Sequence, residues 1–198
     1  STVNAFRNIG VDIDRDRENG MVIEGVGLYG LKDPKQPLDM GNSGTAMRLM
    51  AGVLAGQSFP STMVGDRSLS QRPMARVVEP LLALGADIAA ENTGYSPIRI
   101  RPVKQLKGVD YVMPVASAQV KSAFILAALY ADGVSRVKEP EQTRDHTERM
   151  LSGFGHPVSQ QEGWISVIGK KDLVGANVVV PGDLSSAAFF IVGAAISL

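Results

Sequence analysis

The chain has 198 residues, of which 44% are apolar, and its 20 Lys and Arg residues are balanced by 20 Asp and Glu residues. Such a composition is that of a globular protein, and the absence of cysteine excludes disulfides, thiolate metal sites and a cysteine nucleophile. Zero net charge argues against binding to a nucleic-acid backbone, and no apolar run reaches the about 18 residues of a membrane helix. We therefore expect a cytoplasmic protein whose partners include neither nucleic acid nor membranes.

The first elements are a short helix and a strand in "STVNAFRNIGVDI" (1–13), followed by a second strand after a turn at Asn19-Gly20. A helix that is apolar on almost every face comes next, "GNSGTAMRLMAGVLAG" (41–56). "RPMARVVEPLLALGADI" (72–88) then predicts a helix that starts at Pro73, a glycine stop and a strand. This helix has one apolar stripe, made of Met74, Val77, Val78, Leu81 and Leu82.

The same order then repeats. A second all-apolar helix is predicted in 115–133, an amphipathic helix in 144–158 and a strand pair with a turn at Glu162-Gly163, as at Asn92-Thr93-Gly94 before it. A third all-apolar helix is predicted in 182–198. The unit is strand, apolar helix, strand, amphipathic helix, strand, strand, roughly 70 residues long. Since a helix that is apolar all round must be buried all round, we expect three buried helices inside and sheets outside.

The starts of the apolar helices are candidate anion sites, because a helix N-terminus presents free N–H groups and a partial positive charge. Gly44 allows a ligand to approach the backbone, and Ser117 and Gln119 offer further donors. Arg72 and Arg144 precede the amphipathic helices at equivalent places in the repeat, and guanidinium groups bind phosphate and carboxylate in pairs of hydrogen bonds. The alternative is that the serines are ordinary N-caps and the arginines are solvated charges.

Other polar residues have plainer interpretations. Asp145 and Glu148 flank His146, but their spacing of three favours a capping box over a metal site, and we expect no metal. His156 and Trp164 are expected to be structural. Two roles stay open for Arg48, support of a ligand pocket or a structural ion pair. Lys121, on the second buried helix, could reach the helix end with its charged group.

Five motifs, taken together, resemble one family. "GNSGTAMR", "GDRSLSQRPM", "PVASAQVKSAFILAAL", "TRDHTERML" and "VPGDLSSAAFF" stand in the order found in 5-enolpyruvylshikimate-3-phosphate synthases, and the resemblance covers essentially the whole chain. It implies an α+β fold, the inside-out α/β prism of βαβαββ repeats that enolpyruvyl transferases share. Residues 1–180 would form one lobe, whose first repeat is truncated at its N-terminus, and residues 181–198 would start the second lobe.

The resemblance also implies an activity. Such enzymes transfer the enolpyruvyl group of phosphoenolpyruvate to the 5-hydroxyl of shikimate 3-phosphate and release phosphate, in the shikimate pathway of aromatic amino acid biosynthesis in bacteria. They use no cofactor, and the full-length enzyme is expected to be a monomer. Because the chain starts without methionine and stops inside an apolar helix, we expect a piece of a longer protein. The family's N-terminal loop with its lysine, serine and arginine, and its second lobe, have no counterpart here, so the resemblance implies that this piece is inactive by itself. The alternatives are the UDP-N-acetylglucosamine enolpyruvyl transferase, whose mobile-loop cysteine is missing here, and a non-catalytic anion-binding repeat module.

The resemblance assigns substrate sites residue by residue, with no catalytic residue assigned in this chain. Shikimate 3-phosphate would be held by Ser117, Ala118, Gln119, Thr143 and Arg144. Phosphoenolpyruvate would be held by Asn42, Gly44, Arg72 and Gln119. The family commonly has a second serine where this chain has Ala118, so only the backbone could serve there.

Overall fold

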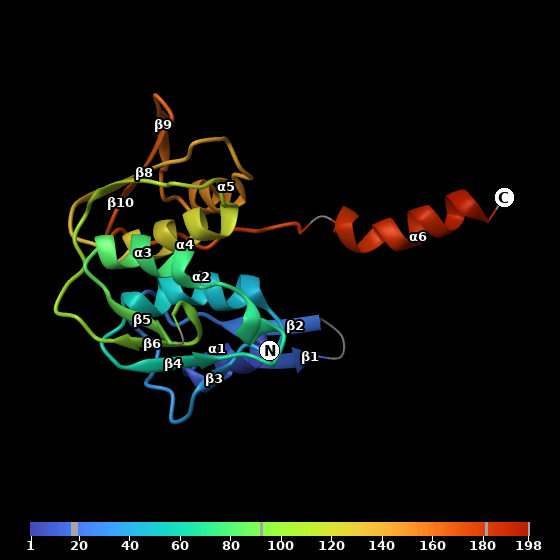
Figure 1. The fold of residues 1–198 in the computed structure, drawn as a ribbon, viewed down its shortest axis with the longest axis horizontal. Coiled ribbons are helices and arrows are strands. Elements are labelled where there is room, and N and C mark those ends of the chain that lie inside the picture. Colours follow the sequence, from blue (N-terminus) through green and yellow to red (C-terminus); the bar gives the residue numbers. More distant parts are fainter. Residues whose placement is uncertain (17–19, 92, 181, 198) are drawn as a thin grey trace.

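Two consecutive stretches of the chain fold by one scheme, which the computed structural model describes for residues 1–16, 20–91, 93–180 and 182–197 (Figure 1). The first stretch contains β3 (Leu38–Asp39), α2 (Gly44–Ala55), β4 (Ser61–Val64), the 3-10 helix η1 (Leu69–Gln71), α3 (Ala75–Ala83), β5 (Asp87–Glu91) and β6 (Tyr95–Arg101). The second contains β7 (Asp110–Val112), α4 (Ala118–Ala128), β8 (Val134–Lys138), α5 (His146–Gly153), β9 (Ser159–Gln161) and β10 (Trp164–Ile168).

The two sheets have the same strand order, β3-β4-β6-β5 and β7-β8-β10-β9. In each sheet the first two strands are parallel, joined through the apolar helix, and the other neighbours are antiparallel. The pairing register sets Met63 opposite Ile98 in one sheet and Val137 opposite Ile165 in the other, and all four side chains are buried. The strand–helix–strand–helix–strand–strand repeat predicted from the sequence is therefore confirmed.

The chain opens with the last part of such a unit. The opening elements are α1 (Thr2–Asn8), β1 (Asp12–Asp16) and β2 (Gly20–Glu24), and the two strands pair as an antiparallel hairpin. Of the three turns expected, Glu162-Gly163 adopts positive φ angles of 52° and 79°, as a tight hairpin turn requires. Asn19 and Asn92, in the other two turns, lie outside the described residues.

Two of the apolar helices, α2 and α4, run side by side between the two four-stranded sheets (Figure 1). Both are buried over most of their length, and they are in close contact at Gly52, where a Cβ atom would lie only 2.1 Å from the carbonyl oxygen of Ala123. Side chains from both helices join a single apolar core with the inner faces of the sheets. For these two helices, the expected arrangement of helices inside and sheets outside is confirmed.

The third apolar helix, α6 (Leu184–Ile196), is not buried, and the expectation of three buried helices is wrong for it (Figure 1). Phe189 and Phe190 on this helix are 85% and 82% exposed. The physical reason is its connection: the extended segment 171–180 leads away from the body, so no described sheet covers the helix. The helix is nevertheless apolar on every face, which is typical of a helix that packs against other parts of a protein.

The amphipathic helix α3 differs from the expectation in two details. It begins at Ala75 and not at Pro73, because the backbone N–H groups of Met74 and Ala75 both donate to the carbonyl oxygen of Gly94, which holds this end against the β5–β6 hairpin. The apolar stripe is buried except for Leu82, which is 49% exposed. None of the helices in the described part of the chain is long and apolar enough to cross a membrane.

Candidate functional site

The starts of α2 and α4 lie next to each other and are joined by side chains. Ser43 caps α2, accepting from the N–H of Ala46 at 3.1 Å, and Ser117 caps α4, accepting from the N–H of Val120 at 3.4 Å. The N-cap interpretation of these serines is therefore confirmed. Across the gap, Gln119 Nε2 donates to Thr45 Oγ1 at 2.7 Å. Two positively polarised helix ends are thus brought to one place.

Arg48 connects the two helix starts. Its Nη1 donates to Gln119 Oε1 at 2.8 Å, and its Nη2 donates to the carbonyl oxygen of Pro73 at 3.1 Å. Partial burial, and then the positive charges of Arg72 and Arg76, lower the pKa of Arg48. No described carboxylate forms an ion pair with Arg48, and its two acceptors, Gln119 Oε1 and the carbonyl oxygen of Pro73, are both neutral. Of the two roles left open by the sequence, support of a pocket is the one that this geometry favours.

Arg72 is held by a short chain of hydrogen bonds. Its Nη2 donates to Asn42 Oδ1 at 2.8 Å, and Asn42 Nδ2 donates to Asp66 Oδ2 at 2.8 Å. The other carboxylate oxygen of Asp66 accepts from the backbone N–H of Leu69 at 2.7 Å. The hydrogen bond from Leu69, followed by that from Asn42, lowers the pKa of Asp66, so this anchor is a carboxylate at neutral pH.

Gly44, in the first turn of α2, lies against these arginines. A Cβ atom at this position would be 3.0 Å from Arg48 Nη1 and 3.5 Å from Arg72 Nη1. The structure therefore brings together all four residues that the resemblance assigns to phosphoenolpyruvate: Asn42, Gly44 and Arg72 on one side, and Gln119 across from them on α4. The chemistry of this cluster, three guanidinium groups beside two helix N-termini, is that of a site for a small anion.

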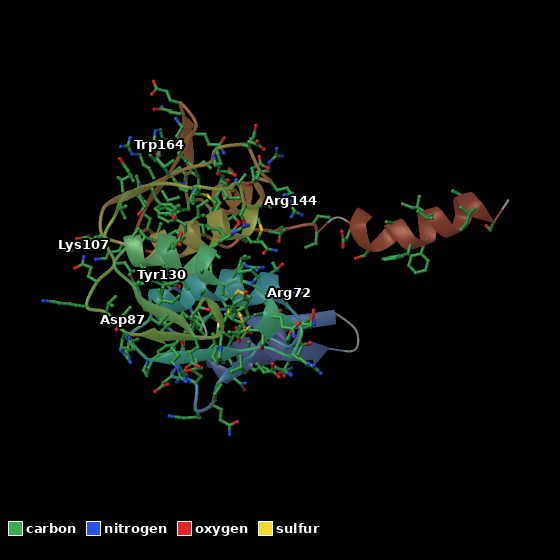
Figure 2. All side chains as sticks on the ribbon, in the orientation of Figure 1. Arg72, Asp87, Lys107, Tyr130, Arg144 and Trp164 are labelled. Atoms are coloured by element: carbon green, nitrogen blue, oxygen red, sulfur yellow. The ribbon has the colours of Figure 1, made fainter. Side chains whose placement is uncertain are left out.

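The residues assigned to shikimate 3-phosphate fall into two groups. Ser117, Ala118 and Gln119 form the start of α4, and because Ser117 Oγ accepts a hydrogen bond, its own proton remains available to a ligand. Thr143 and Arg144 lie in the loop before α5. Both donors of Thr143, the backbone N–H and the hydroxyl, go to Glu139, while Arg144 is exposed and forms no ion pair with a described residue. In Figure 2, Arg144 and Arg72 lie on the same side of the body.

The capping box expected at Asp145 and Glu148 is wrong. Asp145 makes no side-chain cap hydrogen bond; it accepts from Arg149 Nε at 2.8 Å, one helical turn along. Glu148 is buried and lies 2.7 Å from the ammonium group of Lys121. Lys121 does not extend to the helix end as its sequence position allowed. The sequence does contain a signal for this ion pair, since a lysine on an otherwise apolar, buried helix requires a buried counter-charge.

His156 and Trp164 are structural, as expected. His156 is fully buried, and burial lowers the pKa of its imidazole. The ring of Trp164 on β10 lies beneath the charged groups of Arg136 and Lys138 on β8, at 5.2 and 5.8 Å from its centre. These are cation–π contacts between neighbouring strands.

Comparison with known proteins gives one consistent result. The chain matches the family of EPSP synthase (3-phosphoshikimate 1-carboxyvinyltransferase) over residues 1–198. It is 54% identical to the 3-phosphoshikimate 1-carboxyvinyltransferase of Alkalilimnicola ehrlichii and 55% identical to that of Methylococcus capsulatus, in each case over 100% of this chain. The solved structure of EPSP synthase from Acinetobacter baumannii superposes on 98% of the chain with a TM-score of 0.89 and 52% identity.

The chain spans less than half the length of the proteins it matches: 44% and 45% of the two curated relatives and 44% of the solved chain. Within that span, the enolpyruvyl transferase fold expected from the five motifs is confirmed by the superposition. Since the family match includes every residue of the chain, the chain belongs to the EPSP synthase family.

Proposed function

We propose that this chain is part of a 3-phosphoshikimate 1-carboxyvinyltransferase, with residues 1–180 as one lobe and residues 181–198 as the start of the second. In the proposed reaction, the 5-hydroxyl of shikimate 3-phosphate loses its proton to a base and its oxygen adds to C2 of phosphoenolpyruvate, while C3 takes up a proton. C3 then loses a proton, the C2–C3 double bond forms again, the bond from C2 to the phosphate oxygen breaks, and phosphate leaves. Membership of the family and relatives of that name at 54% and 55% identity support the proposal.

The cluster at the starts of α2 and α4 is the observation that carries the proposal. Both substrates are anions, and the cluster offers guanidinium groups and helix N-termini without a described carboxylate paired to Arg48. We assign Asn42, Gly44, Arg72 and Gln119 to phosphoenolpyruvate. The guanidinium groups and helix N-termini of the cluster would stabilise the charge that develops on the departing phosphate, so the proposed chemistry needs no metal ion or cofactor.

Shikimate 3-phosphate is assigned to the start of α4 and to the loop before α5. Ser117 and Gln119 offer side-chain donors, and Ala118 offers only its backbone N–H. Arg144 is exposed and would provide the charged contact to the phosphate, while Thr143 holds the loop through Glu139. The enzyme is proposed to be a cytoplasmic monomer that acts on these two small molecules.

The test is phosphate release from phosphoenolpyruvate by the complete enzyme that contains this chain. Release is expected with shikimate 3-phosphate as acceptor and not with UDP-N-acetylglucosamine, and the 198-residue chain alone is expected to release none. Phosphate release only with UDP-N-acetylglucosamine would instead favour the alternative, a UDP-N-acetylglucosamine enolpyruvyl transferase. Release with neither acceptor would overturn the proposed activity.

A further inference from the structure

Lys121, in the first turns of α4, is a buried cation between two carboxylates. Its side chain is 1% exposed, and its Nζ lies 2.7 Å from Glu139 Oε2 and 2.7 Å from Glu148 Oε1. The side chains of Glu139 and Glu148 are themselves only 6% and 4% exposed. A buried charge is costly unless it is paired, and here one ammonium group serves two carboxylates. Such an arrangement calls for a reason beyond charge balance.

The two carboxylates differ in what else they contact. Glu139 Oε1 accepts both donors of Thr143, the backbone N–H at 3.1 Å and the hydroxyl. Glu139 therefore links the buried helix α4 to the loop that carries Arg144. Glu148 lies on α5 and has no contact of this kind: its interaction with Lys121 is an ion pair without hydrogen-bond geometry, and its oxygens have no hydrogen-bond partner in the described part of the chain.

The loop before α5 has little else to fix its position. Residues 140–142 and Arg144 are exposed, so no apolar packing anchors them. A cavity of about 270 Å³ lies between the loop and the hairpin turn at Glu162 and Gly163, and Lys121, Glu139 and Glu148 line it together with Gln142 and Thr143. Two charge-assisted hydrogen bonds to one carboxylate are therefore the main restraint on the place of Thr143.

We propose that Glu139, held in place by Lys121, is a positioning residue that sets the loop of Thr143 and Arg144 relative to the start of α4. Because both Thr143 donors are used by Glu139, the loop presents Arg144 toward solvent on the side where Arg72 also lies (Figure 2). The consequence for shikimate 3-phosphate rests on the proposed function. The restraint itself is a property of the chain without ligand.

The chain offers a matched pair of variants, Glu139→Gln and Glu148→Gln. Each leaves Lys121 with one buried carboxylate, so each keeps a one-to-one buried ion pair and the same shape. Only Glu139→Gln affects Thr143: one oxygen of Glu139 accepts both Thr143 donors and the other faces Lys121, whereas a glutamine has a single, neutral oxygen for the two roles. A third variant, Thr143→Val, removes the hydroxyl and leaves all three charges in place.

Amide hydrogen exchange of the 198-residue chain without ligand is the first measurement. Exchange at Thr143 is expected to rise at least about tenfold in Glu139→Gln, from the loss of charge-assisted hydrogen bonds, and to stay within about twofold in Glu148→Gln. Thr143→Val is expected to raise amide exchange at position 143 by a smaller factor than Glu139→Gln does. The double variant is expected to exchange no faster than Glu139→Gln alone. Equal exchange at Thr143 in the two glutamine variants would overturn the proposal.

Calorimetric titration with shikimate 3-phosphate is the second measurement. Affinity is expected to fall at least about fivefold in Glu139→Gln and to change by less than about twofold in Glu148→Gln, with closely similar melting temperatures for both. Equal losses of affinity in both would mean that the buried charge acts only through stability, which contradicts a positioning role. If the unsubstituted chain bound no shikimate 3-phosphate, the assignment of that substrate to residues of this chain would fail, and the exchange data would still decide on the restraint.

Discussion

Replacing Gly52 by alanine is expected to destabilise the chain, although alanine is the better helix former. The added Cβ would lie 2.1 Å from the carbonyl oxygen, 2.9 Å from the carbonyl carbon and 3.0 Å from the Cα of Ala123. All three atoms are backbone, so no rotamer change on α4 can make room, and the two helices must move apart.

The magnitude follows from two opposed effects. Overpacking of a close contact costs about 1–3 kcal/mol, and backbone on both sides of the contact places this case in the upper part of the range. Alanine regains about 1 kcal/mol of helix propensity. The net loss is roughly 1–2 kcal/mol, which lowers the melting temperature of a domain of this size by roughly 2–8 °C.

Thermal unfolding followed by circular dichroism measures this loss, and Gly193→Ala is the matched control. Gly193 lies in α6, where an added Cβ would meet nothing within 4 Å, so the same exchange should leave the melting temperature unchanged or slightly higher. A Gly52→Ala chain that melts at or above the temperature of the unsubstituted chain would refute the close packing of α2 against α4.

Three further predictions concern single charged or polar groups. Arg48→Met removes the hydrogen bond to Gln119 and is expected to raise the KM for phosphoenolpyruvate in the complete enzyme about tenfold. The melting temperature should not fall, because the substitution also relieves repulsion between Arg48 and the neighbouring arginines. An unchanged KM would show that Arg48 is not part of the site. The lowered pKa of Asp66 means that its carboxylate stabilises the chain above about pH 4 and that this contribution is lost as the pH falls further, so the urea midpoint of Asp66→Asn should depend less on pH between about 2 and 5. Burial raises the pKa of Tyr130 to about 12, so an absorbance titration should show a late tyrosinate transition that is missing in Tyr130→Phe, and stability should fall as the pH rises above about 10.

The repeat was predictable because the same order of apolar helix, amphipathic helix and strand pair occurs twice in the sequence. A helix that is apolar on every face is expected to be buried, and a helix with one apolar stripe is expected to pack on a surface through that stripe. The order of the two helix types therefore indicated which helices lie inside the fold and which lie outside. The glycine and asparagine turns marked the strand pairs. The prediction of a buried helix was wrong for α6, because an apolar composition indicates that a helix tends to be buried but does not indicate which other part of a protein packs against it.

The candidate site was predictable in part. Arg72 and Gly44 could be paired from the motifs, and the structure places them within contact of each other. The roles of Arg48 and Lys121 could not be read from local spacing, because their partners lie 71 and 18 positions away on different elements. The role of Glu139 depends on the same distant contact with Lys121, although its other partner, Thr143, is only 4 positions away. Asp145 and Glu148 show the converse error: a local pattern suggested a cap, and a buried lysine on another helix was the stronger partner for Glu148.

The central claim is that the arginines gathered beside the starts of α2 and α4 bind phosphoenolpyruvate, and kcat/KM for phosphoenolpyruvate in the complete enzyme tests it most directly. Arg72→Ala is expected to lower this value at least about tenfold, the effect of losing a hydrogen bond to a charged group. Arg101→Ala, at the exposed last residue of β6 where Arg101 forms a surface ion pair with Asp87, should leave it within about twofold. An Arg72→Ala enzyme as efficient as the unsubstituted one, or an equal loss in Arg101→Ala, would contradict the account.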